Sequence, residues 1–187
     1  MSSPAFDLTF PHAWSAEILA APLAILPARH FVYPAQVEEV ERGALEVLVK
    51  PEGSGPFLAT CALGFRDPLV PTGIWAAPNP HELCAVSGGY VYLINTNAPE
   101  RFTMLPFRPA LQILPAKEAD LLLFVGHRAI LAWGTQGEAW QSPKLSDEGV
   151  TVTAVEDQLL RGLGWNLTSD KETPFTLDLR SGVLINV

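Results

Sequence analysis

The chain has 187 residues, of which 48% are hydrophobic and 17% are charged, with 17 prolines and 14 glycines. This length suits one substantial domain, and the composition is that of a turn-rich globular protein, which excludes disorder over most of the chain. The net charge of −8, with 12 Lys and Arg residues, argues against nucleic-acid binding, which normally needs a basic stripe.

The N-terminal part of the chain carries signals for two short helices and a strand. Residues Ser15–Ala21 predict a short helix that starts at a serine cap and ends near a proline. Residues Pro34–Arg42 predict a second short helix, which a glycine ends. In the segment Leu45–Val49, three apolar residues alternate with Glu46 and Leu48, which predicts a strand with one face on a core.

In the middle of the chain, the sequence pattern predicts a series of strands separated by turns. The segment Phe57–Phe65 is almost wholly apolar, which is typical of a strand buried on both faces. Gly88-Gly89 leads into a β-branched and aromatic run at Tyr90–Ile94. Further strands are predicted at residues 110–114, 121–125 and 128–133. The last of these leads through a hairpin connection, Gly134–Gly137, to residues 138–140.

Strand signals are clearest in the C-terminal third. The segment Val150–Val155 and the segment Phe175–Leu179 alternate in polarity, and between them Leu159, Leu163 and Trp165 share one face. Consecutive strands joined by short turns predict an antiparallel sheet. The fold predicted is therefore mostly β: a single antiparallel domain, either a two-sheet sandwich or an irregular barrel, with one or two short helices and at least about twice as much strand as helix.

Two further patterns bear on the organisation of the chain. Glycine-led strands begin near Gly43, Gly89 and Gly126, and another run begins near Leu159, at intervals of 46, 37 and 33 residues. Propeller blades repeat at roughly 40–50 residues, so a small propeller-like arrangement is the alternative fold. Prolines within residues 99–115 mark an alternative domain boundary, but the apolar character of this segment favours one domain over residues 1–187.

The reactive side chains form no recognisable catalytic pattern. His81 and Cys84 are the closest pair, and a hydrolase that uses them is an alternative function. Without a CxxC pair they do not complete a zinc site, and Cys61 lies among apolar residues. Glycine-rich phosphate loops and a G-x-S-x-G motif are also absent. We therefore expect no catalytic, metal or cofactor-binding residue, no cofactor, and no enzymatic activity.

Five tryptophans are a high number for a chain of this length. Packing in the core is the favoured interpretation, and Trp133 and Trp140 flank the same predicted hairpin. The alternative is that exposed tryptophans form a carbohydrate-binding surface. Trp75 lies in a proline-rich segment, residues 66–80, that predicts a rigid loop suited to recognition of a partner.

An acidic cluster precedes the strand at Leu45–Val49 and gives the second recognition signal. Together with Trp75, Glu38, Glu39 and Glu41 are the candidate partner-binding residues, and their charge favours a basic protein partner. The N-terminal residues lack the pattern of a secretion signal, and the apolar runs are too short to span a bilayer. The expected function is that of a non-enzymatic, cytoplasmic protein-binding or regulatory β-module, with no membrane or nucleic-acid partner.

Overall fold

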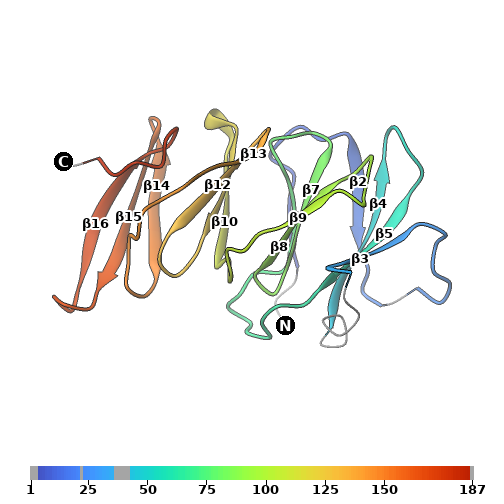
Figure 1. Cartoon of the computed structure of the whole chain (residues 1–187), viewed down its shortest axis with the longest axis horizontal. Coiled ribbons are helices and arrows are strands. Elements are labelled where there is room, and N and C mark those ends of the chain that lie inside the picture. Colours follow the sequence, from blue (N-terminus) through green and yellow to red (C-terminus); the bar gives the residue numbers. More distant parts are fainter. Residues whose placement is uncertain (1–3, 22, 36–42, 186–187) are drawn as a thin grey trace. The chain divides into compact units, whose positions relative to one another are not determined.

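The computed structural model describes residues 4–21, 23–35 and 43–185 (Figure 1). Strands make up 51% of the structure and helix 2%, which confirms the predicted mostly-β class and the predicted excess of strand over helix. Within the described part of the chain, the helical segment is a single 3-10 turn, η1 (Lys117–Ala119), and no helix is long and apolar enough to cross a membrane.

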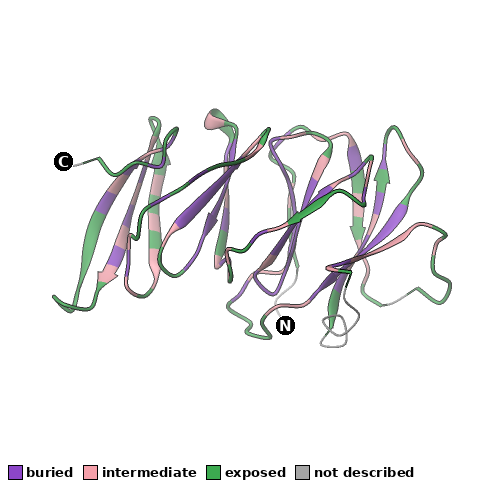
Figure 2. Ribbon diagram, viewed as in Figure 1, coloured by how far each residue is buried: buried purple, intermediate pink, exposed green. Residues whose placement is uncertain are grey.

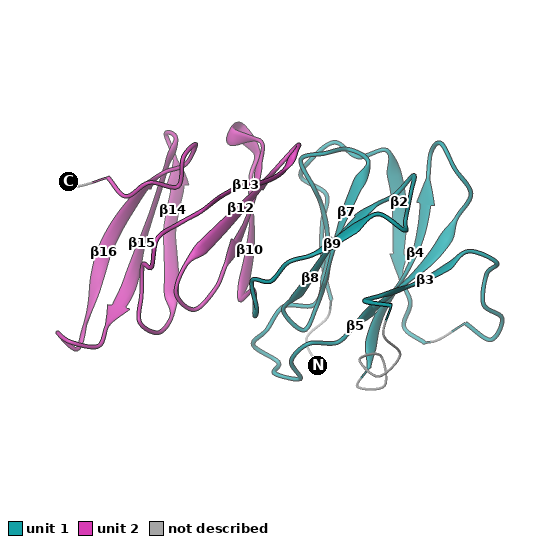
Figure 3. Ribbon diagram, viewed as in Figure 1, with its two compact units in different colours: residues 1–109 teal, residues 110–187 magenta. Residues whose placement is uncertain are grey.

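The chain divides into two compact units, residues 1–109 and residues 110–187 (Figure 3). Each unit contains two sheets, and the four sheets that the structure describes do not close into a barrel. The division lies within the proline-punctuated segment 99–115.

Unit 1 holds sheets A and B. Sheet A has the order β1-β6-β7-β8-β9, and sheet B has the order β2-β4-β5-β3. All neighbours in these sheets are antiparallel except β1 with β6 and β3 with β5, which are parallel. The strands of sheet A are β1 (Ala5–Asp7), β6 (Gly73–Ala76), β7 (Glu82–Ser87), β8 (Tyr90–Asn95) and β9 (Phe102–Met104). Those of sheet B are β2 (Trp14–Ile18), β3 (His30–Tyr33), β4 (Ala44–Pro51) and β5 (Phe57–Ala62).

The core of unit 1 lies between its two sheets. Tyr92 on β8 reaches across and donates its hydroxyl hydrogen bond to the carbonyl of Ala62 at 2.9 Å. Tyr33 on β3 packs near Tyr92, with ring centroids 6.5 Å apart, and donates to the carbonyl of Pro99 at 2.7 Å. Because both buried hydroxyls are satisfied in this way, two large aromatic rings fill the space between the sheets without leaving a polar group unpaired.

Unit 2 holds sheets C and D, which are antiparallel throughout. Sheet C has the order β10-β11-β12-β13, and sheet D has the order β14-β15-β16. The strands are β10 (Gln112–Ala116), β11 (Leu121–Val125), β12 (Ile130–Gly134), β13 (Gly137–Gln141), β14 (Val150–Glu156), β15 (Leu159–Asn166) and β16 (Lys171–Asp178). Figure 2 shows buried residues along β11, β12, β15 and β16. Side chains from both sheets form one apolar cluster that includes Leu123, Ala132, Trp140, Leu160, Phe175 and Leu177.

A strand meander recurs along the chain at an almost constant interval. The meander of sheet A begins at Gly73, that of sheet C at Gln112 and that of sheet D at Val150, so the intervals are 39 and 38 residues. The glycines that marked a repeat in the sequence do not start these meanders. Gly88 and Gly89 instead occupy the tight turn between β7 and β8, with φ of 54° and 74°, as a two-residue hairpin turn of type I′ requires.

Most of the predicted strands are confirmed, but the two predicted helices are not. The segment predicted as a helix at Ser15–Ala21 instead contains β2, because buried and exposed residues alternate from Trp14 to Ile18 and the strand pairs with β4. The predicted helix at Pro34–Arg42 lies almost wholly outside the described residues. The hairpin at Gly134–Gly137 is confirmed, but because these two glycines pair with each other, the loop is two residues long instead of the four residues that the sequence predicts.

On β15 Leu160 is the one large apolar residue that faces the core, and the other core-facing positions are glycines. Leu160, Gly162 and Gly164 are buried, whereas Leu163 and Trp165 share a half-exposed face with Arg161, which forms an ion pair with Glu156. A Cβ atom on Gly162 would lie 2.4 Å from the Phe175 ring, so the core on this strand has room for backbone only. Leu163 and Trp165 therefore point outward.

Candidate functional site

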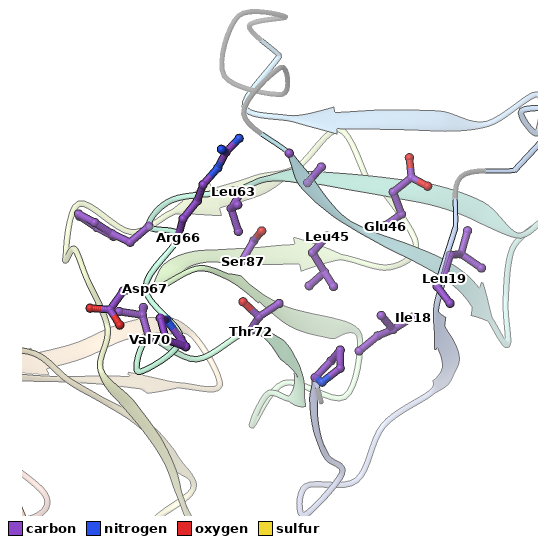
Figure 4. A pocket seen from close by; sticks show the side chains of 16 residues that line it. Ile18, Leu19, Leu45, Glu46, Leu63, Arg66, Asp67, Val70, Thr72 and Ser87 are labelled. Carbon is purple, nitrogen blue, oxygen red and sulfur yellow. The ribbon is translucent and has the colours of Figure 1, made fainter. Parts of the chain in front are cut away.

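Two features of the structure are suited to binding: a pocket in unit 1 and a strand edge in unit 2. The pocket has a volume of about 840 Å³ and lies between sheets A and B, where the ends of β2, β5 and β7 meet the start of β4. Figure 4 shows apolar side chains around it, including Ile18, Leu45, Leu63 and Val70. Pockets of this size and apolar character are typical of small-molecule sites.

The floor of the pocket carries two hydroxyl groups. Ser87, at the end of β7, is fully buried, and its Oγ has no hydrogen-bond partner among the described residues. Thr72, which also lines the pocket, accepts a hydrogen bond from the backbone N–H of Gly88 at 2.9 Å through its Oγ1. Both lie near the centre of the view in Figure 4. A buried hydroxyl without a partner costs stability, and because Ser87 has no exposed surface, its Oγ is enclosed by the protein and is not accessible from the pocket.

Charged side chains stand at the rim of the same pocket. Glu46 on β4 and Asp67 in the loop after β5 contribute carboxylates, and Arg66 contributes a guanidinium. The Asp67 carboxylate accepts a hydrogen bond from the backbone N–H of Leu69 at 2.9 Å, which fixes the turn beside the pocket. Glu46, however, lies on the face of β4 opposite to Leu45, and Figure 4 shows its carboxylate pointing away from the pocket, so it does not add charge to the mouth.

The second feature is the outer edge of β14. In the order of sheet D, β14 is terminal and pairs with β15 alone, so the backbone groups on its other side have no partner within the described part of the chain. At the opposite end of the sheet, residues after β16 cover the edge: Asp178 donates its N–H to Val183 and Ile185 donates to Thr176. One edge of sheet D is thus covered in part, at residues 176–178, by the chain itself, and the other is open.

The open strand is uncharged along most of its length but has acidic residues at both ends. Residues Val150–Val155 are all valine, threonine or alanine, and Thr151 and Thr153 are exposed. A β-bulge lies between Val152 and Ala154. Exposed carboxylates of Glu148 before the strand and of Glu156 and Asp157 after it surround this uncharged stretch.

Of the partner-binding residues proposed from the sequence, the structure describes Trp75 alone. Glu38, Glu39 and Glu41 lie outside the described residues. Trp75 was expected on an exposed loop, but it lies in β6 with 5% of its surface exposed, which corrects that prediction. The reason is that β6 pairs with β1 on one side and β7 on the other, so the middle of the proline-rich segment is an interior strand.

The cysteines have the properties of core residues. Cys61 and Cys84 are both free thiols with no exposed surface, and burial raises the pKa of each. The negative charge of Glu82 raises the pKa of Cys84 further. His81 is exposed and lies within 3.3 Å of the Asn97 amide. An activated thiolate needs a lowered pKa and access to substrate, so the arrangement gives the hydrolase alternative no support.

The tryptophans are mostly interior. Four are buried, with exposed fractions of 8% or less: Trp14, Trp75, Trp133 and Trp140. Trp165 is half-exposed. Trp133 and Trp140 do not pair with each other across the hairpin, because the register sets Trp133 opposite Glu138 and, beyond a bulge at Ala139 on β13, Trp140 opposite Ala132. A carbohydrate platform of several exposed indoles is therefore not formed by these residues.

No cluster of three or more His, Cys, Asp or Glu side chains that would hold a metal ion occurs in the described ranges. No protein-family model matches the sequence, and a search of curated proteins gives no significant match. Both candidate sites therefore rest on the geometry alone. Sequence patterns identified β14 as a strand but gave no sign that it ends a sheet, and the pocket is built from segments far apart in the chain.

Proposed function

We propose that this protein is a non-enzymatic, cytoplasmic protein-binding module that takes an extended segment of a partner protein onto the open edge of β14. The observation that supports this most directly is the unpaired backbone of a seven-residue strand. An open edge binds a partner strand through main-chain hydrogen bonds, and proteins usually shield such edges with charge, proline, a covering segment or a β-bulge, of which β14 has the bulge at Thr153. The stretch Val150–Val155 has no charge and no proline.

Side chains on β14 supply the selectivity of this edge. Val150 and Val152 pack against the core of unit 2, while Thr151 and Thr153 face solvent. A segment that pairs with β14 would extend both faces of sheet D. It would place apolar residues on the core face and β-branched or hydroxyl-bearing residues on the solvent face, opposite the threonines. The proposed partner segment therefore alternates in polarity and is rich in valine, isoleucine and threonine.

Charge at the two ends of β14 defines the flanks of the partner segment. Glu148, Glu156 and Asp157 are exposed around an uncharged strand, so lysine or arginine on either side of the partner segment would be attracted to them. The proposed partner is therefore still a basic protein, as the sequence suggested, and its proposed binding site lies in unit 2. Salt should slow the association, because these exposed charges are screened at high ionic strength.

The first step of the test is photo-crosslinking. A photoreactive amino acid at Thr153 should capture a protein from a lysate of the cells that make this chain. The captured peptide should be an alternating, β-branched segment flanked by lysine or arginine. The same photoreactive residue at Glu118, which is exposed on η1, is the control and should not capture that protein.

The second step uses a synthetic peptide with the sequence of the captured segment. Thr153→Pro should weaken peptide binding at least tenfold, because proline fixes φ and removes a backbone donor from the edge. The melting temperature should change little, since Thr153 is exposed and lies in the bulge. Peptide binding that Thr153→Pro leaves unchanged, or a captured peptide without the stated pattern, would contradict the proposal.

A further inference from the structure

The chain itself contains a segment that matches the partner proposed for β14. Residues 183–185 follow β16 and form an isolated bridge with it, in which Leu184 lies opposite Leu177. We infer that the open edge of β14 in one molecule binds residues 183–185 of a second copy of this chain, head to tail. This assignment depends on the function proposed above, because it uses the same edge of β14, and it names the partner.

The backbone of Leu184 points away from β16. Asp178 donates its N–H to the carbonyl of Val183, and Ile185 donates its N–H to the carbonyl of Thr176. Successive residues of a strand direct their backbone groups to opposite edges, so the N–H and the carbonyl of Leu184 lie on the outer edge. Neither group has a backbone partner within the described part of the chain. The segment that covers part of β16 therefore presents an open edge of its own.

The side chains of residues 183–185 are apolar and exposed. The exposed fractions are 59% for Val183, 40% for Leu184 and 38% for Ile185. Valine and isoleucine are β-branched and favour strands, and the three residues include no charge and no proline. An uncharged, apolar edge of this kind tends to pair with another strand. Pairing with a second copy would remove part of this apolar surface from water.

The two faces of sheet D determine the register of the pair. Leu184 lies on the core face, because Leu177 opposite it belongs to the buried cluster of unit 2, and Ile185 therefore lies on the solvent face. On β14, Val152 packs on the core side and Thr151 is exposed. Antiparallel pairing of Leu184 with Val152 places Ile185 opposite Thr151, so both faces continue in register. These are the residue types that the proposed partner segment needs.

Arg180 supplies the basic flank. It is exposed and precedes Leu184 by four positions, so in this register it lies beside Glu156 and Asp157 at the end of β14 in the other copy. Glu156 forms an ion pair with Arg161 at 3.0 Å, whereas Asp157 takes part in no ion pair among the described residues. Arg180 would therefore bring positive charge to an acidic end of the strand, which favours this partner and this direction.

The same acids disfavour pairing of β14 with the β14 of another copy. An antiparallel pair centred on the strand would bring Glu148 of each molecule close to Asp157 of the other, and like charges opposite each other are destabilising. The contact is therefore between two different surfaces. Because each molecule in such a pair keeps one unused edge, further copies can add at both ends.

Sedimentation velocity of the full chain over a series of protein concentrations tests this contact. We expect the unmodified protein to form dimers and longer assemblies as the concentration rises. Leu184→Pro removes the outward N–H but keeps both hydrogen bonds of the bridge to β16, and Thr153→Pro blocks the β14 edge. Each variant alone should be monomeric with a nearly unchanged melting temperature. An equal mixture of the two should form a dimer and no longer assembly, because only one pair of edges remains intact.

A charge reversal tests the role of Arg180. Arg180→Glu should weaken self-association about fivefold or more, since it replaces attraction to Glu156 and Asp157 by repulsion. Lys171→Glu is the matched control: it makes the same change at an exposed position on β16, outside the residues that bridge to Leu184, and should leave self-association unchanged.

The outcomes separate this inference from the proposed function. A chain that is monomeric at every concentration would overturn the choice of a second copy as partner, while peptide capture at Thr153 would still support protein binding by β14. Self-association that Thr153→Pro leaves unchanged would place the contact elsewhere. Failure of the mixed variants to form a dimer would also overturn the inference, because a head-to-tail contact requires that the two intact edges bind each other.

Discussion

Trp140 donates its indole N–H to the backbone carbonyl of Leu179 at a distance of 2.9 Å, and both residues are buried. Trp140 lies on β13 of sheet C, whereas Leu179 directly follows β16 of sheet D, so one hydrogen bond joins the two sheets of unit 2. The carbonyl of Leu179 lies in an apolar cluster, where an unpaired polar group is costly. This hydrogen bond therefore constrains the packing of sheet C against sheet D.

Replacement of Trp140 by phenylalanine should destabilise the protein by about 2–4 kcal/mol, because the Leu179 carbonyl loses its partner and the smaller ring leaves a cavity. The measurement is urea denaturation followed by circular dichroism. Trp165→Phe is the control: this indole is half-exposed and should contribute less than about 1 kcal/mol. An equal loss of unfolding free energy in the two variants would show that the hydrogen bond between the sheets contributes little to stability.

Gly164 on β15 should not tolerate a side chain. A Cβ atom there would lie 2.0 Å from the backbone oxygen of Leu145, which cannot move as a flexible side chain could. We expect Gly164→Ala to cost at least about 2 kcal/mol of unfolding free energy. In Gly53→Ala the nearest atom to the new Cβ is Asn97 Oδ1 at 3.7 Å, so this control should change stability little. A similar thermal midpoint for both variants would argue against the close approach at Gly164.

The turn between β14 and β15 offers a stabilising substitution. Asp157 and Gln158 have φ of 51° and 61°, a left-handed conformation that costs a residue with a side chain about 1–2 kcal/mol. Gln158→Gly should therefore raise the unfolding free energy by about 1 kcal/mol. Gln136→Gly makes the same change in the hairpin turn between β12 and β13, where the backbone φ is not positive, and should give no gain. Calorimetry of both variants compares the two turns, and a gain in Gln136→Gly alone would contradict the argument.

Both thiols should be inert in the native protein. Cys61 and Cys84 have no exposed surface, and burial raises the pKa of each, so thiolate is scarce at neutral pH. Ellman's reagent should therefore label neither cysteine in native buffer and both in denaturant. Rapid labelling of Cys84 under native conditions would revive the hydrolase alternative.

Stability should fall as the pH rises above about 8.5, the ordinary pKa of a thiol. Because the folded protein holds the Cys61 and Cys84 protons while the unfolded chain releases them, each thiol lowers the unfolding free energy by about 1.4 kcal/mol per pH unit. Burial also raises the pKa of Tyr33, and the nearby Cys61 contributes, so a further loss should begin near pH 10.

The double variant Cys61→Ala/Cys84→Ala should show a shallower decline between pH 8.5 and pH 10, even though each cavity lowers its stability at neutral pH. Tyr33→Phe should flatten the decline above pH 10. Denaturant melts at a series of pH values provide the measurement. A slope that the double variant does not change would mean that the thiols do not control alkaline unfolding.

Local patterns determined the identity of most strands. Leu45, Val47 and Val49 alternate with Glu46, Leu48 and Lys50, and they are the buried face of β4, since side chains on a strand alternate between its two faces. The run at Phe57–Ala62, apolar except for Thr60, is buried at every position of β5, which lies between β3 and β4. The alternation of side chains between two faces is a property of the β-strand backbone, so it can be recognised in a single sequence.

Tertiary structure decided which strands are central, which are edges and which face of a strand meets the core. Trp75 is interior because β1, from the far N-terminal end, pairs with β6, and nothing in the local sequence encodes that parallel pairing. Gly162 and Gly164 face the core because the Phe175 ring and the Leu145 carbonyl occupy the space that side chains would need. The open edge of β14 and the pocket around Ser87 arise in the same way. Both depend on which distant segments pair, and pairing over long sequence separations is set by the packing of the whole unit rather than by any local pattern.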